Sequence, residues 1–154
     1  MADYIQQYRR VRRYLEKIQD QDRDRTEYED DLWSFFQNCW HLKDWLISDE
    51  DPSVSPELRD ELKHKLSDSL RSHANLRICA DLANRTKHLK LKNPWADAIA
   101  RGDIKLDFTE EMTPTRLEYR ITLDDNTEHS ALDVARQAVE EWQHILADHA
   151  MPTE

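Results

Sequence analysis

Four polar residues on one predicted helix have the types and spacing for acid–base chemistry. The segment 76–92, LRICADLANRTKHLKLK, carries Arg77, Asp81, Asn84 and His88 at intervals of four, three and four residues. A helix turns by about 100° per residue, so these side chains share one narrow face beside an apolar one. Histidine exchanges protons near neutral pH, and arginine stabilises a phosphorane-like transition state. The pattern predicts a candidate site for chemistry on RNA.

An earlier segment repeats the same spacing. In the helix predicted over 26–47, the residues Ser34, Asn38, His41 and Trp45 also form one stripe, and Asp44 flanks His41. If the two helices are neighbours, Asn38, His41 and Asp44 can face the later stripe, with His41 as a second proton carrier. A tryptophan on an otherwise polar stripe indicates a second contact surface.

Two runs of positive charge lie near these stripes. The first is Arg9, Arg10, Arg12 and Arg13, which we interpret as a solvated helix face. The second is Arg85, Lys87, Lys90 and Lys92, which could hold phosphates close to the candidate site. The whole chain has a net charge of −10, which argues against non-specific binding of nucleic acid.

The run from Asp81 to His88, DLANRTKH, in this helical layout resembles the HEPN superfamily. These are all-helical domains, many of them ribonuclease toxins or defence proteins. Active members use an arginine and a histidine a few residues apart, usually at a dimer interface and without a metal. The resemblance covers at most residues 4–92 and the last helix. Two residues separate Arg85 from His88 and ten separate Arg77 from His88, so neither pair has the family's spacing.

The resemblance implies roles for individual residues. His88 would be the acid–base group, with Arg77 or Arg85 as the phosphate stabiliser. Asp81 and Asn84 would orient His88. The implied partners are RNA, a second copy of the chain in a homodimer, and a cognate protein of the toxin–antitoxin kind.

Three other uses of the stripes stay open. His41 and Asp44, with Asp81 and His88, could hold a metal ion, but no HExxH motif is present, and we expect no metal or cofactor. A hydrogen-bonded network could fix the register of the helices. The stripe with Trp45 could instead contact a partner protein in a non-enzymatic interaction or dimerisation module.

Composition favours a mainly α fold of the α+β kind. The chain has 154 residues with a single glycine, and 38% of its residues are hydrophobic. We predict one domain over 1–154: a bundle of about five helices in which residues 1–92 are helical, 103–129 form a small antiparallel β-hairpin, and 130–150 form the last helix. A short third strand at 128–129 is compatible with the pattern. Expected helix caps are Thr26, Ser55 before Pro56, and Ser130.

Cys39 and Cys79 fall on apolar helix faces, which predicts buried reduced thiols. Neither has CxxC spacing, so we expected no thiolate metal site or redox pair. The first residues, MADYIQQYRR, lack the apolar run of a secretory signal, and no stretch is long and apolar enough to span a membrane. The sequence predicts a cytoplasmic protein.

Overall fold

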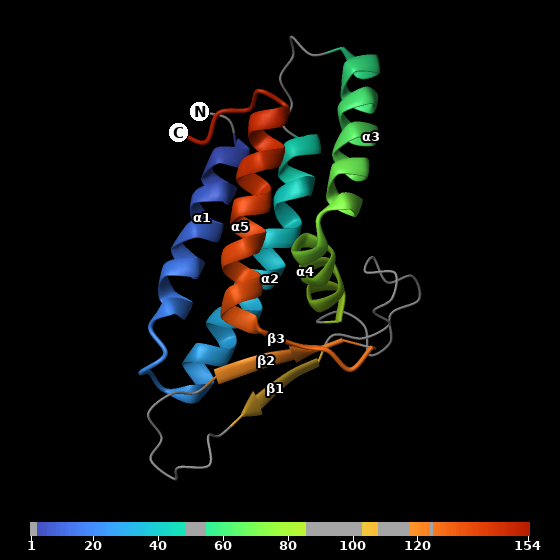
Figure 1. Cartoon of the computed structure of the whole chain (residues 1–154). Coiled ribbons are helices and arrows are strands. Elements are labelled where there is room, and N and C mark those ends of the chain that lie inside the picture. Colours follow the sequence, from blue (N-terminus) through green and yellow to red (C-terminus); the bar gives the residue numbers. More distant parts are fainter. Residues whose placement is uncertain (1–2, 49–54, 86–102, 108–117, 124) are drawn as a thin grey trace.

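The fold is a helical bundle with a small sheet at one end (Figure 1). The computed structural model describes residues 3–48, 55–85, 103–107, 118–123 and 125–154. Within them are five helices and three strands, which confirms the predicted mainly α fold with a hairpin before the last helix. The helices are α1 (Asp3–Gln19), α2 (Arg25–Ser48), α3 (Pro56–Ser72), α4 (Ala74–Arg85) and α5 (Ala131–Asp148), and the strands are β1 (Asp103–Asp107), β2 (Glu118–Thr122) and β3 (Glu128–Ser130).

Helix α2 lies at the centre of the core. It packs against α1, α4, α3 and α5, and its apolar residues at helical spacing form a broad buried face. Five residues at that spacing are all buried, and burial of such side chains is the main favourable term in folding. They are Leu32, Phe35, Cys39, Leu42 and Leu46.

Helix starts follow capping chemistry, with one correction. Ser55 and Ser130 cap α3 and α5 as expected: each side-chain oxygen accepts from the backbone N–H three residues later, at 3.3 Å. Thr26 is not the cap of α2. The Asp24 carboxylate accepts from the backbone N–H of Glu27 at 3.1 Å, so the helix begins at Arg25.

Helices α3 and α4 form a bent pair beside the bundle (Figure 1). The break lies at His73, whose backbone is extended. Helix α3 buries only Leu66 and Leu70, while Leu58 is 56% exposed. Helix α4 was predicted to continue to Lys92, but residues 86–102 lie outside the described part of the chain.

The sheet is antiparallel with strand order β1–β2–β3. Asp103 pairs with Thr122 at one end of the first ladder, and Arg120 pairs with Ser130 in the second. Tyr119 and Ile121 of β2 are buried, and β2 and β3 contact α5. Three strands on a helix satisfy the minimum that a small sheet needs for stability.

One continuous apolar cluster joins all five helices and β2. The two ends of the chain meet, because the Tyr4 hydroxyl donates to the backbone oxygen of Pro152 at 2.9 Å. No helix in the described residues is long and apolar enough to cross a membrane.

Candidate functional site

Helix α4 places its polar stripe partly inside the molecule. Asp81 is 1% exposed, while Arg77, Asn84 and Arg85 are half-buried. A buried polar group needs interaction partners, and Asp81, Arg77 and Arg85 each have them. Helix α4 therefore carries one buried acid and two half-buried guanidinium groups. His88 and Lys87, predicted as the acid–base group and a phosphate contact, lie outside the described residues.

The first turn of α4 is held by Glu141 of α5, which the sequence reading did not single out. Glu141 Oε2 accepts from the backbone N–H of Leu76 at 2.9 Å. Its Oε1 accepts from Asn75 Nδ2 at 2.7 Å and from the Asn75 backbone N–H at 3.3 Å. The carboxylate satisfies free N–H groups at the positive end of the helix dipole. Glu141 therefore fixes where the α4 stripe begins.

The α2 stripe faces α1 at Asn38. Gln7 of α1 is 2% exposed and its Nε2 donates to the Asn38 backbone oxygen at 3.0 Å and to Asn38 Oδ1 at 3.1 Å. Asn38 Nδ2 donates to the Ser34 carbonyl at 2.8 Å. The sequence allowed Asn38 to face the α4 stripe if α2 and α4 are neighbours; in the structure its side chain accepts a hydrogen bond from Gln7 at the α1–α2 contact.

Trp45 is the predicted second contact, and its neighbour is also α1. Its ring is partly buried against the core, and the Arg10 guanidinium lies over it at 6.0 Å from the centroid. His41 is half-buried and has its own interaction partner, whereas Asp44 is exposed and pairs with the adjacent Lys43. The stripe at Asn38 and Trp45 is therefore an internal helix contact.

Helices α2 and α4 do pack against each other, and Cys39 and Cys79 meet across that contact. Both thiols are buried and free. In the described residues no three His, Cys, Asp or Glu side chains are grouped so that they could hold a metal ion.

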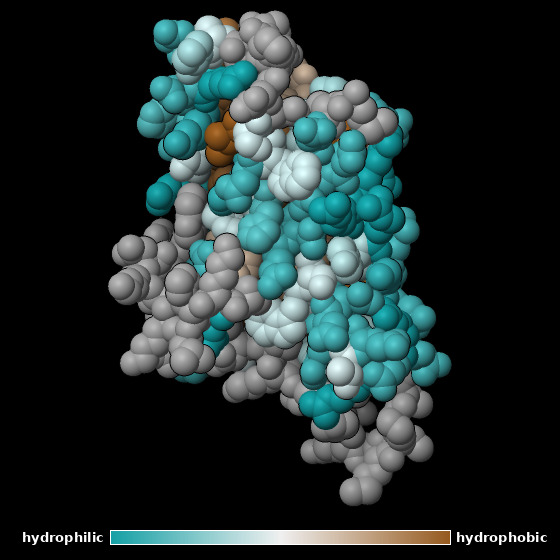
Figure 2. Space-filling model, turned by 180° about the vertical axis from the view of Figure 1, so that it is seen from behind, coloured by the Kyte–Doolittle hydropathy of each residue, from teal (hydrophilic) through white to brown (hydrophobic). Residues whose placement is uncertain are grey.

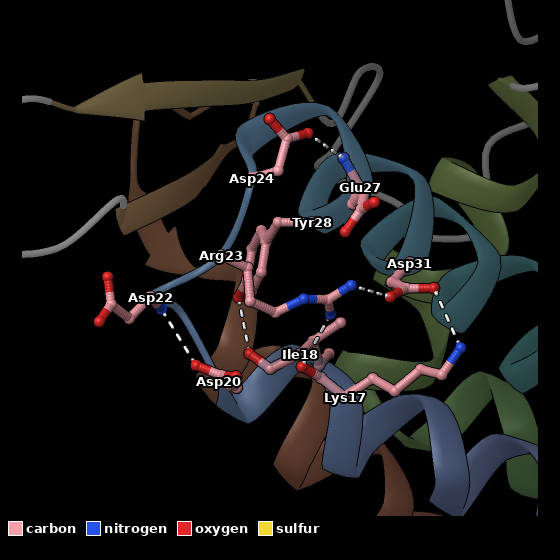
Figure 3. A network of polar contacts seen from close by, with 9 residues as sticks. All are labelled: Lys17, Ile18, Asp20, Asp22, Arg23, Asp24, Glu27, Tyr28 and Asp31. Carbon is pink, nitrogen blue, oxygen red and sulfur yellow. Dashed lines mark hydrogen bonds and ion pairs between the residues drawn. The ribbon is translucent and has the colours of Figure 1, made fainter.

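Polar side chains close the corner between α1 and α2 (Figure 3). Arg23 Nη2 donates to Asp31 Oδ2 at 2.6 Å, and Arg23 Nη1 donates to the Lys17 carbonyl at 3.1 Å. The hydrogen bond and charge of Asp31 raise the pKa of Arg23. The buried Tyr28 hydroxyl donates to the Ile18 carbonyl at 2.8 Å. Asp31 is therefore used in holding the turn between α1 and α2.

Helix α1 carries a cluster of exposed positive charge. We call the exposed residues Arg9, Arg10, Arg12 and Arg13 the arginine surface. Arg12 and Arg13 take part in no ion pair within the described residues. On the face seen from behind the view of Figure 1, most of the coloured side chains are hydrophilic and strongly apolar atoms show only in a small area (Figure 2).

The chain was compared with known protein families, curated proteins and solved structures. No protein-family model, curated protein or solved structure matches the chain.

Proposed function

We propose that this chain is a helical RNA-binding protein that contacts the phosphate backbone through the arginine surface of α1. The polar residues of the α2 stripe then serve as scaffold, because Asn38 is used by Gln7 and Trp45 packs beside α1. The observation that carries the proposal is the exposure of Arg12 and Arg13 without ion pairs, within the described residues of a chain that is acidic as a whole.

Charge supports this choice of surface. The chain has a net charge of −10, so any polyanion is repelled unless it approaches a local cluster of positive charge. Arginine presents a planar fork of donors that can bind two phosphate oxygens at once, whereas lysine acts as a single point charge. Four arginines within five residues therefore favour phosphate over a diffuse acidic partner.

An aromatic ring beside these cations supports a single-stranded ligand. Lys17 lies over the Tyr14 ring of α1 at 5.2 Å. Tyr14 is half-buried, so part of its ring is accessible. Bases of single strands stack on such rings while cations hold the backbone.

The test is fluorescence anisotropy with a labelled single-stranded RNA at several salt concentrations. Replacing both Arg12 and Arg13 by alanine should weaken binding by about tenfold or more and reduce the salt slope by about two. The matched control replaces Lys63 and Lys65 of α3 by alanine, which removes the same charge from another exposed helix. Equal loss in both variants, or no binding by the wild type, contradicts the proposal. Competition by polyglutamate at equal charge would assign the surface to an acidic protein partner.

A second candidate is a metal-independent, HEPN-like ribonuclease of the toxin or defence kind. The burial of Asp81 to 1% exposure on the same helix as Arg77 and Arg85 favours it, since a buried carboxylate can orient neighbouring cationic groups. His88 would move the proton, with His41 as a second carrier. As in the family it resembles, the active form would be a homodimer.

Cleavage of a labelled RNA in the presence of EDTA tests this candidate. A folded His88→Ala or Arg77→Ala protein should lose about 100-fold or more of the activity, while Arg12→Ala should mainly weaken RNA binding. Cleavage by His88→Ala at the wild-type rate rejects the assigned role of His88. Light scattering with and without RNA would show whether two chains associate.

A further inference from the structure

The fold brings together two thiols that lie 40 positions apart in the sequence. Cys39 is at the middle of α2 and Cys79 is at the middle of α4, and both are 0% exposed. Both residues belong to the buried cluster where α2 packs on α4, the two side chains interact there, and both are free thiols. The two cysteines lack CxxC spacing, so the sequence did not predict a redox pair. Packing of α2 against α4 brings them together instead.

Neighbouring groups fix this pair from two sides. Trp142 Nε1 of α5 donates to the Cys39 backbone oxygen at 3.0 Å in the buried core. Glu141, the residue before Trp142, holds the first turn of α4 through Leu76 and Asn75. Helix α5 therefore holds both helices that carry the thiols.

We infer that Cys39 and Cys79 form an oxidation site, at which a peroxide converts the two thiols into a disulfide that joins α2 to α4. One thiolate attacks a peroxide oxygen, breaks the O–O bond and becomes a sulfenic acid. The second thiol then attacks that sulfur and releases water. In total two thiols lose two protons and two electrons, and one hydrogen peroxide becomes two waters.

Reaction requires an opening of the α4 contact. Burial, followed by the hydrogen bond to Cys39, raises the pKa of Cys79 well above its usual value. The reactive thiolate is therefore scarce while the core is closed. Because Glu141 holds the first turn of α4, loss of its charge should make opening more frequent and oxidation faster. This inference is independent of the RNA-binding proposal.

The experiment exposes the folded full-length protein to hydrogen peroxide and follows the intact mass under non-reducing conditions. We expect a monomer that loses 2 Da (two hydrogen atoms), with one disulfide-linked peptide pair that dithiothreitol separates. Cys39→Ala and Cys79→Ala should each fail to form it. Glu141→Gln should oxidise about three times faster or more than the wild type, while Glu140→Gln, an exposed neighbour with the same charge change, should match the wild type.

Several results would overturn the inference. One is wild-type protein whose thiols stay reduced, or progress to sulfinic acid, under conditions where the urea-unfolded chain forms the disulfide. Another is a disulfide that forms only between two molecules. Equal rates in Glu141→Gln and Glu140→Gln would reject the gating role of Glu141.

Discussion

Tyr119 shows how one side chain ties the sheet to the helices. Its hydroxyl donates to Glu29 Oε1 of α2 at 3.0 Å, and its ring stacks on Tyr28 with centroids 5.2 Å apart. Burial, then the hydrogen bond and charge of Glu29, raise the pKa of Tyr119 from 10.0 to about 12. The neutral phenol is therefore the form that the folded protein favours.

The pH dependence of stability follows from that shift. A group whose pKa is raised on folding contributes stability below its unfolded pKa and loses that contribution as pH rises through the folded value. At pH 8 we expect Tyr119→Phe to be less stable than the wild type by about 1–3 kcal/mol, because a hydrogen bond to a charged group is lost. Urea unfolding between pH 8 and 12 should show this difference shrinking above pH 10. A constant difference would contradict the assigned titration.

Partners of single polar residues were the least predictable feature. The spacing of Asn38 placed it on a polar stripe, but its actual partner, Gln7, lies 31 positions away on another helix. Glu141 gave no local signal, since it acts on Leu76, which is 65 positions earlier. A stripe in one sequence defines a helix face, and packing decides which neighbour that face meets.

The contact between α1 and α2 depends on a buried polar pair. We expect Gln7→Ala and Asn38→Ala to destabilise the protein non-additively, with a coupling energy of about 1 kcal/mol from a double-mutant cycle in urea. Gln6 is exposed on α1, so Gln6→Ala combined with Asn38→Ala should be additive and serves as the control. Additivity of the Gln7 and Asn38 effects would mean that the pair does not stabilise this contact.

Helices and strands were predictable because their signals are local. A helix over 26–47, a hairpin over 103–129 and a last helix over 130–150 were predicted, and α2, the paired strands β1 and β2, and α5 occupy those ranges. The start of α2 was misplaced by choosing Thr26, since aspartate at position 24 is an equally good cap and its carboxylate accepts from the Glu27 backbone N–H. His88, at the centre of the predicted site, lies outside the described residues, so its role stays a prediction.

Stability should be unevenly distributed over the molecule. Helix α3 has 17 residues but buries only Leu66 and Leu70, whereas α2 buries eight of its 24 residues. We therefore expect native-state hydrogen exchange to show opening of α3 at a lower free energy than opening of α2. Leu70→Ala should lower the opening free energy of α3 by about 2–5 kcal/mol, and that of α1 by less. Uniform protection across α2 and α3 would show that the bundle opens only as a unit.

The contacts of α5 also bear on how the chain folds. Trp142 bonds to a residue 103 positions earlier, Glu141 to one 65 positions earlier, and Tyr4 reaches Pro152 across 148 positions. Folding rates fall as contacting residues become more distant in sequence, so we expect this bundle to fold more slowly than helical proteins with local contacts. During synthesis the N-terminal helices emerge first. Helices α1 to α4 should therefore stay incompletely packed until the last helix leaves the ribosome.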